Sequence, residues 1–145
     1  MALDMETLIP ATPFGIMELI RRYDLDISGK HAVIIGRSHI VGRPMSILLS
    51  RKSSPGNATV TLTHSRTKNL SEITKQADIV VSALGVPNFL KANMVKQGAI
   101  VIDVGITRVP DETHPKGYVI TGDVDFEAVR HKQVILPQFQ VGLDP

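Results

Sequence analysis

The sequence has 145 residues, of which 43% are hydrophobic and only 4% aromatic, so we expect one domain with a core of aliphatic side chains. It contains no cysteine, which excludes a disulfide framework, thiolate chemistry and zinc sites built on cysteine. No apolar stretch approaches the roughly 20 residues of a membrane-spanning helix. The start, MALDMETL, lacks the basic and apolar regions of a signal peptide.

The net charge of +2 is unevenly distributed along the chain. Eight of the 16 basic residues but one of the 14 acidic residues lie between Lys30 and Lys75. This distribution predicts that one half of the fold attracts an anion, with a solvated basic face as the alternative. The same segment has no aromatic residue to stack on bases, which argues against a nucleic-acid partner.

The first part of the chain predicts a helix, a strand and a second helix. Thr12 and Pro13 are typical of a helix N-cap and first helical position. The apolar residues that follow at helical spacing are Ile16, Leu19, Ile20 and Tyr23. A β-branched run at 31–35 predicts a buried strand, and a second helix is predicted from Gly42. Its buried face is expected to contain Met45, Leu48 and Leu49.

The rest of the chain continues this alternation. Further strands are expected at 59–63, 79–84, 99–104 and 133–136. Short helical segments are expected at 69–76, 90–95 and 123–129, and a polar loop at 110–117. Strands separated by helical segments predict an α/β fold, a single domain with a doubly wound, Rossmann-like parallel sheet and helices on both faces.

The segment VIIGRSHIVGRP (33–44) joins the first predicted strand to the second helix. Its glycines do not have the Gly-x-Gly-x-x-Gly spacing of common dinucleotide sites. Gly36 would permit a sharp turn, Ser38 can donate a hydrogen bond to a phosphate oxygen, and Gly42 would allow close approach to the helix. Because a helix N-terminus favours an anion, the loop is predicted to hold phosphate. A plain turn between strand and helix is the alternative.

Gly85 and Gly105 also follow predicted strands. Ligands of such sheets bind outside the carboxyl ends of the strands. Three glycines at three strand ends therefore predict an open edge for a flat ligand, although each alone would serve a tight turn.

The end of the second predicted strand indicates which nucleotide is bound. Sites for NAD usually place a carboxylate there, to hold the ribose 2′-hydroxyl. Here the strand is followed by Ser65 and Arg66, and no acid occurs before Glu72. Together with Arg37, these residues would attract a 2′-phosphate, so NADP is favoured over NAD.

No catalytic group or metal site is predicted. The five histidines lack metal-ligand spacing, and no Ser-His-Asp set or catalytic carboxylate pair can be singled out. Asp103 and Asp123 lie near strand ends, where we expect them to orient loops by hydrogen bonding rather than to transfer protons.

Six segments in this order resemble the bifunctional methylenetetrahydrofolate dehydrogenase/methenyltetrahydrofolate cyclohydrolase family. They are PATPFGIMELI (10–20), GKHAVIIGRSHIVGRPM (29–45), ATVTLTHSRTKNL (58–70), QADIVVSALG (76–85), GAIVIDVGI (98–106) and GDVDFEAV (122–129). The Gly-Arg-Ser-x-Ile-Val-Gly-x-Pro loop is specific to that family. The resemblance covers about residues 10–137.

The resemblance implies that the chain is the family's NADP-binding domain. It implies that cofactor contacts come from the loop residues Gly36, Arg37, Ser38, Ile40 and Gly42, from Ser65 and Arg66, and from Gly85, Gly105 and Ile106. It further implies an enzyme that oxidises 5,10-methylenetetrahydrofolate and hydrolyses the methenyl product to 10-formyltetrahydrofolate. Such enzymes are cytoplasmic homodimers of one-carbon metabolism and serve purine biosynthesis.

The sequence departs from the family pattern at both ends. The family's catalytic domain, with its Tyr-x-x-x-Lys segment, has no counterpart here, so we expect cofactor binding without catalysis, and folate binding only together with that domain. Residues 1–9 are interpreted as a leader or linker remnant, 10–137 as the cofactor domain and 138–145 as an atypical tail. The alternatives are a non-catalytic dinucleotide-binding or regulatory module, or a domain of another small-substrate dehydrogenase.

Overall fold

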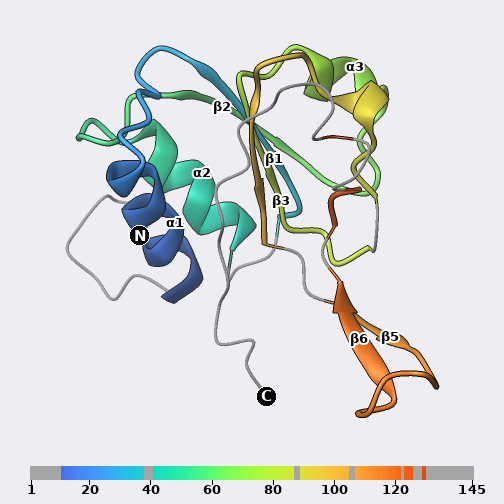
Figure 1. Ribbon diagram of the computed structural model, residues 1–145. Helices are drawn as coiled ribbons and strands as arrows, with labels where there is room; N and C mark the ends of the chain where they lie inside the picture. The colour runs from blue at the N-terminus through green and yellow to red at the C-terminus, as the bar shows by residue number, and fades with distance from the viewer. Residues whose placement is uncertain are drawn as a thin grey trace.

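The computed structural model describes residues 11–37, 41–86, 89–104, 107–121, 123–125 and 129. Its centre is a four-stranded sheet of β1 (His31–Ile35), β2 (Thr59–Thr63), β3 (Ile79–Ser82) and β4 (Ile100–Asp103), in the order β2-β1-β3-β4. All three strand pairs are parallel. The helices α1 (Ala11–Arg22) and α2 (Gly42–Ser50) cover one face, and α3 (Leu70–Lys75) with the short 3-10 helix η1 (Ala92–Met94) covers the other (Figure 1). The predicted doubly wound fold is confirmed.

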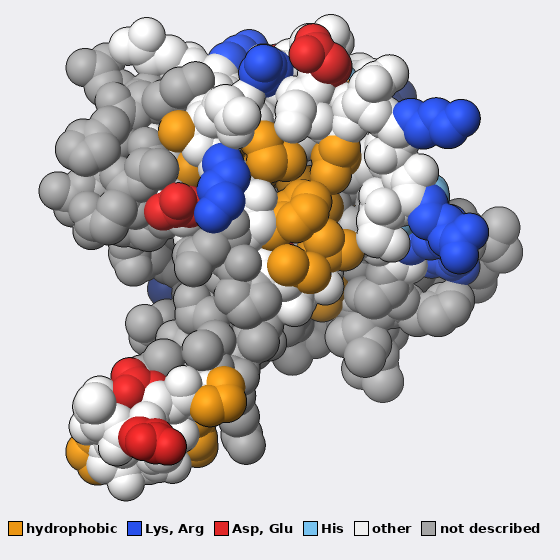
Figure 2. All heavy atoms as spheres, turned by 90° about the vertical axis from the view of Figure 1, so that its right-hand side faces the viewer, with side chains coloured by type: hydrophobic (Ala, Val, Ile, Leu, Met, Phe, Trp, Pro, Cys, Tyr) orange, Lys and Arg blue, Asp and Glu red, His pale blue; other side chains and the backbone are white. Residues whose placement is uncertain are grey.

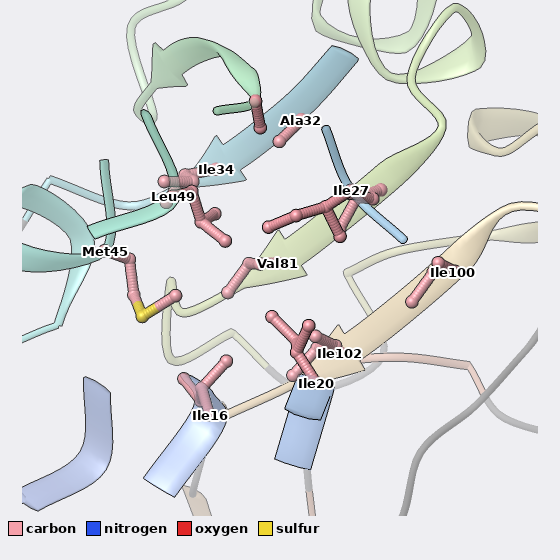
Figure 3. Close-up of a cluster of buried hydrophobic side chains, with 12 residues drawn as sticks. Ile16, Ile20, Ile27, Ala32, Ile34, Met45, Leu49, Val81, Ile100 and Ile102 are labelled. Atoms are coloured by element: carbon pink, nitrogen blue, oxygen red, sulfur yellow. The ribbon is translucent and has the colours of Figure 1, made fainter. Parts of the chain in front are cut away.

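Side chains of the central strands alternate between two apolar clusters, as a period of two residues requires. On β1, Ala32 and Ile34 face the α1 and α2 side, where Figure 3 shows them with Ile16, Ile20 and Met45. Val33 and Ile35 face the opposite cluster. Burial on both faces explains why these strands are continuous apolar runs rather than alternating ones.

The second cluster lies between the sheet and the α3 and η1 side. Its partly buried apolar residues are Leu70, Ile73, Leu84 and Phe89. Apolar side chains are visible at the centre of this side of the molecule in Figure 2, with lysine and arginine side chains around them. Val129 is fully buried in the same cluster, so the described part of the chain near its C-terminal end packs on this face.

The predicted start of the first helix is displaced. α1 begins at Ala11, so Thr12 lies inside the helix rather than at its N-cap. Pro13 is tolerated there because the first N–H groups of a helix have no intrahelical partner. Ile16 and Ile20 are buried as predicted, but Tyr23 lies beyond the last helical residue and is 48% exposed.

Two other predictions are confirmed only in part. The polar loop at 110–117 is flanked by β5 (Thr107–Pro110) and β6 (Tyr118–Thr121), an antiparallel hairpin that projects from the body (Figure 1). The segment predicted as a helix at 123–129 is not helical at 123–125, where Val124 forms a parallel bridge with Leu90, but Val129 is helical and its N–H donates to the Asp125 carbonyl at 3.0 Å. The predicted strand at 133–136 lies outside the described residues.

Candidate functional site

The strand order reverses between β1 and β3. From β1 the chain passes to β2 on one side, then returns to place β3 on the other side of β1. Crossovers that leave in opposite directions open a crevice at the carboxyl ends of these strands. The predicted loops after β1, β2 and β3 all begin at this edge of the sheet.

Gly36, the first residue after β1, lies against the backbone of the β3 loop. A Cβ atom at this position would be 2.5 Å from the Ala83 carbonyl oxygen, and φ is +109°. Its N–H donates to the Thr63 carbonyl at 2.9 Å, while the Ala83 N–H donates to the Ile35 carbonyl at 2.8 Å. No side chain fits here, so glycine is required by both contact and conformation.

α2 begins at Gly42, whose backbone lies against this turn. A Cβ atom on Gly42 would lie 2.0 Å from the Gly36 carbonyl oxygen and 2.8 Å from the Arg37 Cα atom. Gly42 therefore has a packing role, and the approach of a phosphate to the helix stays a prediction. The first turn of α2 carries no acidic residue and Val41 supplies no side-chain cap, so the positive end of the helix is not neutralised by its own first turn.

The turn after β2 presents Ser65 and Arg66 to solvent. It is closed by hydrogen bonds from the Thr67 N–H to the His64 carbonyl (3.0 Å) and from the His64 N–H to the Thr67 hydroxyl (2.9 Å). Arg37 is exposed after the neighbouring strand. Among the residues that the structure describes, neither arginine side chain has an ion-pair partner. This corner of the site is cationic and lacks a carboxylate.

The loop after β3 is fixed by a buried carboxylate. Asp123, which is 0% exposed, accepts hydrogen bonds from the Ser82 hydroxyl (2.9 Å), the Leu84 N–H (2.7 Å) and the Gly85 N–H (3.1 Å). The Asp103 carboxylate accepts from the N–H groups of Asp123 and Val124, each at 3.0 Å. Both aspartates orient loops, as the sequence predicts.

Other charged groups lie at the opposite, amino edge of the sheet. The Asp78 carboxylate accepts a hydrogen bond from the Lys96 ammonium and another from the His31 N–H at 3.0 Å. These bonds, the first being the larger cause, hold the pKa of Asp78 below its ordinary value. A cavity of about 470 Å³ also lies on this side, bounded by the turns at 24–28 and 53–57. Its position away from the carboxyl ends does not suit the ligand of a parallel sheet.

Neither a cluster of metal ligands nor a membrane-spanning helix is found among the described residues. No three His, Cys, Asp or Glu residues within the described ranges converge as metal ligands would. No helix in the described part of the chain is long and apolar enough to cross a membrane.

A doubly wound parallel sheet whose glycine turns meet where the strand order reverses is the architecture of dinucleotide-binding domains. The chain belongs to the tetrahydrofolate dehydrogenase/cyclohydrolase family, whose NAD(P)-binding-domain model matches residues 10–142. The resemblance seen in the sequence is thereby confirmed. The family assignment also removes the alternative of a domain from another small-substrate dehydrogenase.

Curated and solved relatives agree with the assignment. The bifunctional protein FolD of Flavobacterium psychrophilum is 69% identical over all 145 residues, which cover 49% of that protein. The Campylobacter jejuni bifunctional enzyme is 47% identical with a TM-score of 0.77, over 93% of this chain and 45% of that one. A Trypanosoma brucei enzyme, solved with NADP and an inhibitor, is 40% identical with a TM-score of 0.80, over 90% and 43%. The chain spans about half the length of the curated relatives it matches.

The structure brings the described site predictions to one edge of the sheet. Gly36, Arg37 and Gly42 lie after β1, and the others follow β2 and β3. Ser38, Ile40, Gly105 and Ile106 lie outside the described residues. Sequence reasoning missed Ser82, whose hydroxyl holds Asp123. The available sequence signal was the single hydroxyl residue at the end of the apolar run Ile-Val-Val-Ser, which needs a hydrogen-bond partner when it is buried.

Proposed function

We propose that this chain binds NADP at the carboxyl edge of its sheet, as the cofactor domain of a methylenetetrahydrofolate dehydrogenase/cyclohydrolase. The observation that carries the proposal is the contact of Gly42 with Gly36 at the point where the strand order reverses. It brings the start of α2 against the β1 turn with no side chain between them. Such close packing is the role of the third glycine in dinucleotide-binding turns, and it sets the positive end of α2 beside the turn where a pyrophosphate would lie.

The predicted site residues divide along the dinucleotide. The pyrophosphate lies at the loop of Gly36, Ser38, Ile40 and Gly42. The adenosine 2′-phosphate lies near Arg37, Ser65 and Arg66, where arginine side chains supply hydrogen bonds and positive charge. The remaining nicotinamide half extends over the ends of β3 and β4, near Gly85, Gly105 and Ile106.

The absence of a carboxylate at the end of β2 supports NADP over NAD. A carboxylate there would repel the 2′-phosphate, whereas Ser65 and Arg66 are exposed at this position. The domain's role is then to hold and orient the cofactor, which, when bound, accepts a hydride from the substrate. We name no catalytic residue in this chain.

In the whole protein we expect oxidation of 5,10-methylenetetrahydrofolate to the methenyl form, followed by hydrolysis to 10-formyltetrahydrofolate. The curated relatives are about twice the length of this chain and so have room for a further domain. We assign folate binding to a catalytic domain of that kind. We further propose a cytoplasmic homodimer that supplies one-carbon units to purine biosynthesis.

Isothermal titration calorimetry of the chain with NADP and NAD tests the cofactor assignment. We expect saturable binding of NADP, about tenfold or more tighter than that of NAD, because a desolvated 2′-phosphate contact contributes on the order of 1–3 kcal/mol. Equal affinities would contradict the cationic corner as a specificity site. The absence of binding by either dinucleotide would overturn the proposal as a whole.

Activity is tested separately, by mixing the chain with a separately expressed catalytic domain. Recovered dehydrogenase turnover would support the enzyme assignment. NADP binding without turnover in the mixture would instead favour a non-catalytic, regulatory module.

A further inference from the structure

One residue, Asp123, holds both ends of the loop that follows β3. Its carboxylate accepts hydrogen bonds from Ser82, Leu84 and Gly85 at the start of the loop. Its main-chain carbonyl accepts the Leu90 N–H at 2.9 Å at the other end. The Asp125 N–H donates to the Leu90 carbonyl at the same distance, which secures that end a second time.

Asp103 holds Asp123 in turn. It is the last residue of β4, and its two carboxylate oxygens accept the N–H groups of Asp123 and Val124. Val124 then pairs with Leu90 in a parallel bridge. The position of the β3 loop is therefore set from the end of β4 through two successive carboxylates, rather than by the packing of apolar side chains alone.

These two carboxylates act on only one half of the proposed cofactor site. In a doubly wound sheet the adenosine ribose lies at the end of the second strand and the pyrophosphate at the first strand–helix turn. The nicotinamide half is left to the ends of β3 and β4, where Leu84 and Gly85 are held. Resting on the proposed function, we infer that Asp123, supported by Asp103, is a positioning residue for the nicotinamide half of NADP and has no part in binding the adenosine half.

The arrangement of acceptors, rather than the volume of the side chain, carries this role. Among the described residues, the three groups that contact the Asp123 carboxylate all donate to it. Ser82 and Leu84 donate to one oxygen, and the Gly85 N–H lies 3.1 Å from the other oxygen and 3.2 Å from the first. Asparagine has the same shape but replaces one oxygen with an NH₂ donor. If the Asn oxygen keeps the Ser82 and Leu84 bonds in Asp123→Asn, the NH₂ group faces the Gly85 N–H, another donor, so we expect the Gly85 end of the loop to shift.

The test compares two ligands by calorimetry on the 145-residue chain. NADP occupies the whole proposed site, whereas adenosine 2′,5′-bisphosphate lacks the nicotinamide half. We expect Asp123→Asn to weaken NADP about tenfold and adenosine 2′,5′-bisphosphate by less than about twofold. Asp125→Asn is the matched control, because it makes the same chemical change two residues along, at a carboxylate whose ion-pair contact is the exposed Lys91 ammonium 3.7 Å away. It should alter neither affinity.

The two ligand affinities of the variant distinguish the positioning role from the proposed function. Equal losses for both ligands, or no loss for either, would overturn the positioning role while leaving NADP binding by the unaltered chain, and so the proposed function, intact. If the unaltered chain binds neither ligand, the proposed function fails and this inference fails with it. If Asp123→Asn does not fold, Ser82→Ala replaces it, since it removes one donor and leaves the two N–H bonds. A weakening of about twofold confined to NADP supports the role, and any other pattern overturns it.

Discussion

The two halves of the carboxyl edge are built by opposite physical means. At the β1 turn, Gly36 and Gly42 bring main chains together because neither carries a side chain. At the β3 loop, Asp123 and Asp103 hold main-chain N–H groups with buried or half-buried carboxylates. At the β1 turn the Gly36 N–H donates to the Thr63 carbonyl of the neighbouring strand, whereas at the β3 loop the N–H groups of Leu84 and Gly85 donate to a side-chain carboxylate. On the proposed function, the first half is the one placed to hold phosphate beside the start of α2, and the second half lines the site.

Gly42→Ala is expected to have the largest effect on the first half. Its Cβ atom would lie 2.0 Å from the Gly36 carbonyl oxygen, so the backbone of the loop or of α2 must shift. We expect a loss of about 3 kcal/mol in the free energy of unfolding, measured by urea titration, and no detectable NADP binding. Gly29→Ala is the control. At Gly29, φ is +74° but a Cβ atom meets nothing within 4 Å, so only about 1 kcal/mol of backbone strain is expected. Similar losses for the two variants would contradict the packing argument.

Asp123→Ala should have the second-largest effect, on the other half. It leaves the Ser82 hydroxyl and the N–H groups of Leu84 and Gly85 without their acceptor. The expected loss is about 2 kcal/mol in the free energy of unfolding. The same measurement on Asp125→Ala should show a loss of less than about 0.5 kcal/mol in the free energy of unfolding, since its 3.7 Å ion pair with the exposed Lys91 is screened by solvent. A neutral Asp123→Ala would mean that apolar packing, not the carboxylate, holds the loop.

Arg37→Ala tests the choice between NADP and NAD at the first half of the site without changing the fold. Because Arg37 is exposed next to the β1 turn, its loss should leave the unfolding free energy unchanged. We expect NADP to bind about tenfold more weakly and NAD to be nearly unaffected, since only NADP carries the 2′-phosphate. Lys52→Ala, which removes one exposed positive charge after α2, should change neither affinity. Parallel losses for both dinucleotides would refute the specificity role of Arg37.

The sequence predicts the glycine half more completely than the carboxylate half. Gly36 and Gly42 could be named from the sequence as the glycines of a strand-to-helix turn, although their contact with each other was not predicted. Asp103 and Asp123 could be placed near strand ends, but the donors that each would hold could not be named. Ser82, Leu84 and Val124 meet these carboxylates through contacts 20 or more residues apart in the sequence, which local patterns do not encode.

Contacts between residues far apart in the sequence also explain the errors in the predicted secondary structure. Val124 was expected in a helix, but it pairs with Leu90 in a bridge, and 123–125 are not helical. Pro110 and the polar residues after it indicated a loop, and the flanking strands β5 and β6 were missed. That loop closes on itself, with the Asp111 N–H donating to the Gly117 carbonyl at 3.0 Å. The β-branched run of Val119, Ile120 and Thr121 was the available signal.

Substitution of Asp78 is expected to have the smallest effect on the free energy of unfolding. Like Asp123, Asp78 accepts a hydrogen bond from a main-chain N–H, but it lies at the exposed amino edge of the sheet, so it serves as a comparison for the buried carboxylate. Its side chain is 35% exposed and contacts the Lys96 ammonium. The pKa of Asp78 is lowered in the folded state by the hydrogen bond from Lys96 and by the one from the His31 N–H. The ionised carboxylate therefore stabilises the folded state above the unfolded-state pKa of about 3.9, and this stabilisation is lost as the pH falls through the lower pKa of the folded state.

After allowance for solvent screening, we expect Asp78→Asn to cost about 0.5 kcal/mol in the free energy of unfolding at pH 7. Urea titrations from pH 7 to pH 3 should show this difference shrinking below about pH 4. A difference that grows on acidification would contradict the assigned direction, and a cost at pH 7 equal to that of Asp123→Ala would mean that burial does not distinguish the two carboxylates.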